Sequence, residues 1–460
     1  MVWVTQWAPT AEELSSCIDC GLCLPACPTF LLTGDESASP RGRITAMRAV
    51  DRALVPIDER FGEVMDLCLQ CRACETACPS LVPFGRMMEG ARAEAAAHQP
   101  DVATIGKRIL FGRLVGSRGS VALGSLLIGL SQRAGLSDMV PGVLRKSDAL
   151  RTVPIPAPTT AGREWFPEGD PVGTVAFLSG CVMDPWYSAT HVAVVQVLRT
   201  AGYRVVAPRE QTCCGALAAH EGAAYDAARM AAQNVEAFAG FDHVVVDSAG
   251  CSAHMKGYGH WVVGGGELAP RVVDANVFVA GLIENGSLPA FDGDCPIAVQ
   301  DPCHLRHAQR IVEEPRMILR AAGYQPVDID PAGMCCGAAG AYQLSHPDVS
   351  EQLGLHKAEQ IAATGLSLVA SANPGCEMQL NTYLGERYEV VHPIELYWQA
   401  IENQEPRTKT GRSNAEDRAS WLLALGSWLS DLSRVHVHQA RLEPAAPNGL
   451  DHPIDGGDPD

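Results

Sequence analysis

The sequence predicts a multidomain protein of mixed α+β and α/β class, in which a helical N-terminal domain precedes two duplicated α/β domains with parallel sheets. Three observations predict this fold. Two similar cysteine runs lie within residues 1–95, among helical stretches. Beyond residue 170, short apolar runs alternate with helical segments, which is typical of parallel strands joined by helical crossovers. That second pattern occurs twice in the same order, as expected for a duplicated domain.

Each cysteine run reads C-x2-C-x2-C-x3-C-P, the spacing that binds cubane iron–sulfur clusters in bacterial ferredoxins. In this pattern three closely spaced thiolates hold one [4Fe–4S] cluster, while the fourth completes the other cluster. Zinc is the alternative, but it closes on four tetrahedral ligands and has no use for the Cys-Pro that ends each run. We therefore expect two clusters, one on Cys17, Cys20, Cys23 and Cys78, and the other on Cys68, Cys71, Cys74 and Cys27.

Residues 1–95 form the predicted dicluster ferredoxin-like domain, and residues 96–170 form a helical connector that ends in a proline-rich linker. Between the cysteine runs, Arg41 and Arg43 either offset the negative charge of the clusters or are ordinary surface charges. In the connector, the run Val121–Leu130 is about half the length needed to cross a bilayer and predicts a packed helix. The basic stretch Gly106–Arg113 is either a solvated helix face or a contact with anionic lipid.

The duplicated domains are predicted at residues 171–290 and 291–400, and each contains a Cys-Cys-Gly (CCG) sequence. Corresponding cysteines are 122 residues apart at three positions and 125 at the fourth. Since they follow strands or lie beside them, each set is expected to converge at the carboxyl ends of a parallel sheet. The cysteines are candidate ligands of a further iron–sulfur or other metal centre, or else inert buried thiols. The sets are Cys181, Cys213, Cys214 and Cys251, and Cys303, Cys335, Cys336 and Cys376.

Two histidines lie next to these cysteines. His254 and His304 are either extra ligands and proton carriers, or packed residues that support the cysteines. We expect packing, or support of the cysteines, rather than ligation.

Charge and cysteine usage exclude several classes of function. A formal net charge of −18 opposes nucleic-acid binding. Of 17 cysteines, only Cys295 lies outside the motifs, which is how a metal protein rather than a disulfide scaffold uses cysteine. The first residues carry no secretory signal pattern, so we expect a reducing, cytoplasmic compartment. No G-x-G-x-x-G follows a predicted strand, so FAD is expected only on partner subunits.

Residues 401–460 are predicted to form a C-terminal helix and a disordered tail. Apolar residues recur at helical spacing between Trp421 and Leu432, which indicates a packed face or a face that docks a partner or a membrane. The Pro-, Gly- and Asp-rich segment 444–460 predicts disorder.

Together these motifs resemble the glycolate oxidase iron–sulfur subunit family, over residues 12 to about 400. The resemblance implies an electron-transfer subunit with no catalytic residue of its own. It also implies FAD-containing dehydrogenase partners and a quinone or membrane electron acceptor, with the protein at the inner face of the cytoplasmic membrane. In the fullest CCG pattern a CxxC pair closes each motif, whereas here His254 and Gln379 stand at the second position. The segments that carry the likeness are CIDCGLCLPACPTFLLTGDE, SPRGRI, CLQCRACETACPS, TCCGAL, DPCHLRHAQRI, MCCGAAGAYQL and NPGCEMQL.

The resemblance leaves the substrate open between glycolate, D-lactate and glycerol 3-phosphate, because substrate choice belongs to the flavin subunit. A catalytic role of the CCG cysteines, as in heterodisulfide reductase, is the alternative, and the missing second cysteines of the CxxC pairs oppose it. A redox sensor is a third interpretation, but no DNA-binding motif accompanies the cysteines.

Overall fold

The N-terminal domain is a group of short helices, several of which begin at capping residues that the sequence supplies. Thr10 and Glu13 form a reciprocal capping box at the first helix, and Ser39 and Asp58 cap two later helices through side-chain oxygens. Fully buried methionines, including Met47 and Met87, fill the core between these helices. The helices are α1 Ala11–Ser16, α2 Pro28–Thr33, η1 Glu36–Ala38, α3 Pro40–Asp51, α4 Glu59–Asp66, α5 Ala73–Thr76 and α6 Phe84–His98.

The protein is described here from a computed structural model, which covers residues 3–98, 106, 108–133 and 159–403. All described residues belong to one compact unit of the chain, Met1–Arg407. The proline-rich linker at 153–160 is described only at its last two residues, and the predicted C-terminal helix and tail beyond residue 403 lie outside the described residues.

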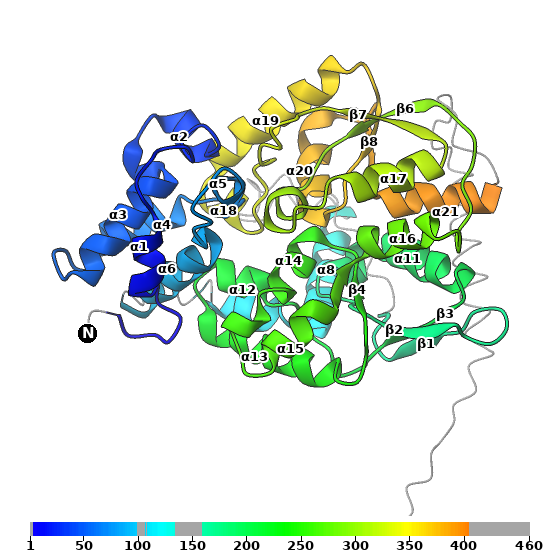
Figure 1. Cartoon of the computed structure of the whole chain (residues 1–460), viewed down its shortest axis with the longest axis horizontal. Coiled ribbons are helices and arrows are strands. Elements are labelled where there is room, and N and C mark those ends of the chain that lie inside the picture. Colours follow the sequence, from blue (N-terminus) through cyan, green and yellow to red (C-terminus); the bar gives the residue numbers. More distant parts are fainter. Residues whose placement is uncertain (1–2, 99–105, 107, 134–158, 404–460) are drawn as a thin grey trace, which may run out of the picture. The chain divides into compact units, whose positions relative to one another are not determined.

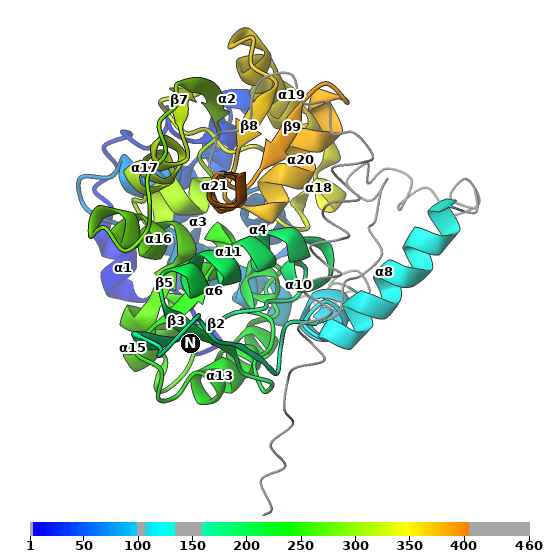
Figure 2. The same ribbon diagram turned by 90° about the vertical axis from the view of Figure 1, so that its right-hand side faces the viewer.

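The connector contains a π-helical segment, η2 Arg108–Leu114, and the helix α8 Arg118–Arg133. The run Val121–Leu130 is therefore helical, as predicted, and Trp186 of the next domain donates a hydrogen bond to Ser125 at 2.7 Å. The helix is only partly packed, because Leu123 and Leu127 are each 59% exposed within the described part of the chain. Figure 2 shows α8 extending from the side of the fold.

The first α/β domain is built on a five-stranded sheet in the order β1-β3-β2-β4-β5. Strands β2 to β5 are parallel, whereas β1 Arg163–Trp165 pairs antiparallel with β3, an edge strand that the sequence did not predict. The strands are β2 Gly173–Phe177, β3 Tyr203–Ala207, β4 Val244–Val246 and β5 Val272–Asp274. The helices are α10 Met183–Trp186, α11 Ser188–Thr200, α12 Ala216–His220, α13 Ala224–Ala237, α14 Ala249–Met255, η5 Tyr258–His260, α15 Gly265–Leu268, η6 Ala269–Arg271 and α16 Ala275–Glu284.

The second α/β domain repeats this arrangement with a parallel sheet in the order β7-β6-β8-β9, which matches β3-β2-β4-β5 of the first. The predicted duplication and the predicted fold class are thus confirmed. The strands are β6 Cys295–Val299, β7 Tyr324–Asp328, β8 Leu368–Ala370 and β9 Glu389–Val391. The helices are η7 His304–Ala308, α17 Glu313–Ala321, α18 Tyr342–Ser345, α19 Pro347–Ala363, α20 Pro374–Leu384 and α21 Pro393–Asn403.

Helices from both α/β domains pack between the two sheets and bury one shared core. Figure 1 shows α11, α16, α17 and α21 in this position. Val194, Leu198, Ile318 and Tyr397 are fully buried there. Because side chains of both domains contribute to this core, packing fixes the two domains against each other. The cysteine-bearing ends of their sheets are positioned by the same packing.

Candidate functional site

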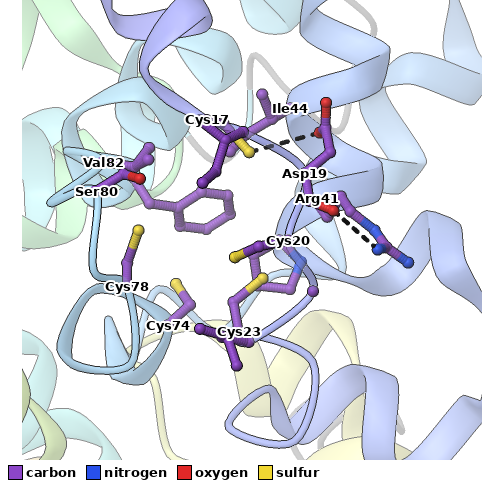
Figure 3. A pocket seen from close by; sticks show the side chains of 15 residues that line it. Cys17, Asp19, Cys20, Cys23, Arg41, Ile44, Cys74, Cys78, Ser80 and Val82 are labelled. Atoms are coloured by element: carbon purple, nitrogen blue, oxygen red, sulfur yellow. Dashed lines mark hydrogen bonds between the residues drawn. The ribbon is translucent and has the colours of Figure 1, made fainter.

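The first predicted cluster site is a pocket in the N-terminal domain lined by sulfur atoms. Cys17 ends helix α1, and Cys20 and Cys23 follow in the loop after it. Cys78, from the second cysteine run, lines the same pocket (Figure 3). Ile44 and Phe84 form part of its apolar wall, and Cys74, which was assigned to the other cluster, also lines it. The structure thus brings together the four cysteines that were assigned to this cluster.

Arginines hold the loop that carries these cysteines. Arg48 donates hydrogen bonds to the carbonyls of Leu14 and Cys17, and its ion pair with Asp19 spans 2.7 Å. Arg41 lines the pocket and donates to the carbonyl of Asp19 at 3.2 Å. Sequence reasoning missed Arg48, since nothing in its local sequence indicates a partner about thirty residues earlier.

Arg43 is buried, which excludes the interpretation that it is an ordinary surface charge. Its side chain is fully buried and donates to the carbonyl of Ala38 at 2.6 Å and to the carbonyl of Val64 at 2.9 Å. It also reaches the hydroxyl of Thr29, which lies 3.2 Å from the sulfur of Cys27. Arg43 therefore fixes the segment that places Cys27.

The second predicted set, Cys27, Cys68, Cys71 and Cys74, is buried. Burial raises the pKa of the Cys74 thiol well above its usual range, and the charges of Cys71, Cys68 and Cys27 act in the same direction. These four thiols therefore lie close enough to influence one another. Closely grouped buried thiols fit a metal cluster, because a bound cation offsets the cost of deprotonating them.

The four cysteines of the first α/β domain converge beyond the carboxyl ends of its parallel strands. Cys181 follows β2, Cys213 and Cys214 precede α12, and Cys251 lies in α14 after β4. The sulfurs of Cys181 and Cys213 are 3.2 Å apart. Hydrogen bonds with Cys213 and then Cys251 raise the pKa of Cys214 well above its usual range, so the contacts continue through the whole set.

The second α/β domain repeats this convergence. The sulfurs of Cys336 and Cys376 are 3.3 Å apart. Hydrogen bonds with Cys303 and then Cys336 raise the pKa of Cys335 well above its usual range. In the described part of the chain, no three His, Cys, Asp or Glu side chains are placed to hold a single metal ion. Metal binding by either CCG set therefore stays a prediction. Cys295 lies in β6, outside both sets.

The two histidines beside the CCG cysteines take part in a buried polar cluster. The Nδ1 atom of His254 lies 3.7 Å from Glu89 Oε1, on helix α6, and His304 stacks on His220 with ring centroids 5.6 Å apart. Burial raises the pKa of Glu89, but His254, followed by His220 and His260, lowers it to about 2. Sequence reasoning missed Glu89, which reads as one acidic residue in an ordinary alanine-rich helix.

The second cysteine run also contacts the CCG set of the second α/β domain. Cys71 and Cys303 belong to one buried cluster with Cys335 and Tyr342. Burial, followed by the charge of Cys303, raises the pKa of the Cys71 thiol well above its usual range. One path of neighbouring thiols thus leads from the N-terminal domain into the second α/β domain.

Comparisons with known proteins agree with this arrangement. Residues 13–82 match the 4Fe-4S dicluster domain family, and residues 175–256 and 297–381 match the cysteine-rich CCG domain family. The chain is 34% identical to the probable glycolate oxidase iron-sulfur subunit of Bacillus subtilis over 80% of this chain and 88% of that protein. It is 30% identical to the glycolate oxidase iron-sulfur subunit of Escherichia coli over 85% of this chain and 95% of that protein.

A shorter relative covers part of the chain. Lactate utilization protein A of Shouchella clausii is 28% identical over 47% of this chain and 95% of that protein. Among the described residues, no helix has the length and apolar content that crossing a membrane requires. With a dicluster domain for [4Fe–4S] clusters, two CCG domains and full-length relatives of one kind, this chain belongs to the glycolate oxidase iron–sulfur subunit family.

Proposed function

We propose that this chain is the iron–sulfur electron-transfer subunit of a flavin-dependent 2-hydroxyacid dehydrogenase, with glycolate as the favoured substrate. The observation that carries the proposal is the path of thiols from the pocket that Cys20 and Cys74 line, through Cys71, to Cys303. The named functions of the full-length relatives support the choice of substrate class.

The proposed chemistry is divided between subunits. A 2-hydroxy acid loses two electrons and two protons as it becomes the 2-oxo acid, and FAD on a partner subunit takes both electrons. When bound, each [4Fe–4S] cluster accepts or releases one electron at a time. This chain would hold those electron acceptors close together, with the second set of cysteines buried and the first near the surface, and a quinone would receive two electrons and two protons at the end.

The proposed ligands are the crossed sets predicted from the sequence. Cys17, Cys20, Cys23 and Cys78 would hold one cluster, and their common pocket supports this set. Cys68, Cys71, Cys74 and Cys27 would hold the other, and their mutual effect on thiol pKa supports that set. The two CCG sets are proposed as further metal sites on the strength of their sulfur contacts.

The test is purification of the chain with and without its flavoprotein partners. The chain alone should contain about eight irons from the two N-terminal clusters, no stoichiometric flavin and no activity towards 2-hydroxy acids. Adding the FAD subunits should restore dye or quinone reduction with glycolate. FAD bound to the purified single chain would reverse the assignment of roles. Preference for D-lactate in the same assay would favour the second candidate substrate, which the lactate utilization relative supports.

We also propose that the chain works at the inner face of the cytoplasmic membrane. The exposed leucines of α8, Leu123 and Leu127, and the exposed Ile109 and Leu110 of η2 support a surface contact with lipid. Co-sedimentation with vesicles containing anionic lipid tests this contact. Binding should weaken when Leu123 and Leu127 are both replaced by glutamate, and unchanged binding would contradict it.

A further inference from the structure

The two cysteine loops of the N-terminal domain share a left-handed backbone at two equivalent positions. Each residue of the second loop lies 51 positions after its counterpart in the first, as Cys68 does after Cys17. Asp19 and its counterpart Gln70 both have a left-handed backbone, with φ of 57° and 52°. Two residues further on, Gly21 and Arg72 do so as well, with φ of 82° and 63°. The loops therefore turn alike around their second cysteines, although residues 73–76 continue as helix α5 and residues 22–25 form turns.

The second loop is covered by another part of the same chain. Leu69 and Ala73, which flank Cys71, are 4% and 6% exposed. They pack with Cys303 and Cys335 of the second α/β domain. Nearby, Tyr342 donates a hydrogen bond to the carbonyl of Leu67 at 3.0 Å. This loop thus docks the second α/β domain, and the contact places Cys71 beside Cys303 and Cys335.

The first loop has no such cover within the described residues. Ile18 and Leu22, the counterparts of Leu69 and Ala73, are 69% and 56% exposed and flank the exposed Cys20. All three line the sulfur-rich pocket of Figure 3. Large apolar side chains grouped around one functional group on a surface mark a contact site for another molecule.

The charges around this pocket indicate a protein partner rather than a membrane. Its charged lining residues are Asp19 and Arg41, and both are already paired, with Arg48 at 2.7 Å and with Glu36 at 2.8 Å. A surface for anionic lipid needs unpaired Lys or Arg. The centre of a protein–protein interface, in contrast, is apolar and depleted of net charge.

We propose that the loop Cys17–Cys23 docks the FAD-containing subunit in the way that the loop Cys68–Cys74 docks the second α/β domain. Ile18 and Leu22 are the apolar contacts on either side of Cys20, as Leu69 and Ala73 are on either side of Cys71. The inference rests on the proposed function, since it assigns the flavoprotein to one of the two ends of the thiol path.

The experiment compares Ile18→Glu and Leu22→Glu with Leu54→Glu in the cluster-loaded chain. Leu54 is 71% exposed, belongs to the same domain and does not line the pocket, so it is a matched control. The first two variants should bind the FAD subunits at least about tenfold more weakly than the wild type, because a charge is forced into an apolar contact. The control should bind normally. Iron content and electron paramagnetic resonance spectra should be unchanged in all three, and Leu22→Asn replaces any variant that loses iron.

The outcomes separate this inference from the proposed function. If no hydroxy acid reduces the wild-type chain in the presence of FAD subunits, the proposed function fails whatever the loop does. If the wild type is reduced, but both loop variants bind the FAD subunits with unchanged affinity, the docking surface is wrong. Variants that keep the FAD subunits and lose only quinone reduction would assign the loop to the electron acceptor instead, which also overturns the inference.

Discussion

Cys78 shows at the scale of single residues how the two cysteine runs depend on each other. It lies in the second run, but its side chain lines the pocket of the first. Cys27 shows the converse. It belongs to the first run, but its charge acts on the thiols of Cys71 and Cys74 in the second run. In the proposed crossed arrangement, each cluster would take one ligand from the other run, which would tie the two halves of the domain together.

Replacing Cys78 tests this crossed arrangement. Cys78→Ala should damage the cluster on Cys17, Cys20 and Cys23, because that cluster would lose its fourth thiolate. Iron content and electron paramagnetic resonance of the purified chain measure the loss. Cys295→Ala is the control, since Cys295 lies in β6 outside every cysteine set. Selective loss of the cluster on Cys68, Cys71 and Cys74 would contradict the crossed ligation.

His392 gives a pH-dependent contribution to stability. Burial lowers its pKa to about 4 from an ordinary value of 6.5, although Asp247 acts in the opposite direction. Between these values the unfolded chain binds a proton that the folded chain does not. The free energy of unfolding should therefore fall as pH drops from 6.5 to 4, by up to about 1.4 kcal/mol per pH unit from this group.

Thermal unfolding of the wild type and of His392→Gln between pH 7.5 and pH 5 measures this contribution. The difference in melting temperature between the two proteins should narrow as the pH falls, because only the wild type loses stability through protonation of His392 in the unfolded chain. A difference that is constant across the range would show that His392 does not titrate as described.

Helix α6 joins domains at the scale of elements. Its Arg92 is 7% exposed and donates hydrogen bonds to the carbonyls of Asp66 and Cys68, at 2.9 Å and 2.6 Å. The same side chain reaches the carbonyl of His220 in helix α12 at 2.5 Å. One guanidinium group thus fixes the start of the second cysteine loop and attaches it to the first α/β domain.

Arg92→Met should lower the free energy of unfolding by about 3 kcal/mol, because several buried carbonyls lose a charged donor. Arg92→Lys should recover only part of this loss, since one ammonium group does not reproduce the several donors of the planar guanidinium group. Chemical denaturation of the cluster-loaded chain measures both variants. Equal stability of Arg92→Met and the wild type would contradict this role.

The contact between the N-terminal domain and the second α/β domain belongs to the scale of the whole molecule. It joins residues as far apart as Leu67 and Tyr342, and Thr76 with His307 at 3.1 Å. Since this contact also brings Cys71 to Cys303, stability and the proposed path for electrons depend on the same interface.

Tyr342→Phe removes the hydroxyl that bonds to Leu67 and leaves the ring in place. We expect a loss of about 1 kcal/mol in the free energy of unfolding, the usual contribution of one hydrogen bond. Tyr388→Phe provides a control on a more exposed tyrosine. If Tyr342→Phe has no larger effect than the control, the hydroxyl does not hold the two domains together.

Local sequence determined the features of this protein that depend on short chain segments. The C-x2-C-x2-C-x3-C-P spacing brings thiols together because only a few residues separate them, and apolar strands alternating with helices favour parallel sheets with cysteines at their carboxyl ends. The repeat of that pattern predicted two domains of one topology, which the matching strand orders confirm.

Tertiary structure decided which copy of a repeated segment is covered. Ile18 and Leu69 occupy equivalent positions in equivalent loops, and yet one is 69% exposed and the other 4%. The partners of Arg48, Glu89 and Arg92, and the antiparallel strand β1, were likewise absent from the sequence analysis. The physical reason is distance along the chain: spacing governs local geometry, whereas burial depends on contacts such as Leu67 with Tyr342, which only the folded chain brings together.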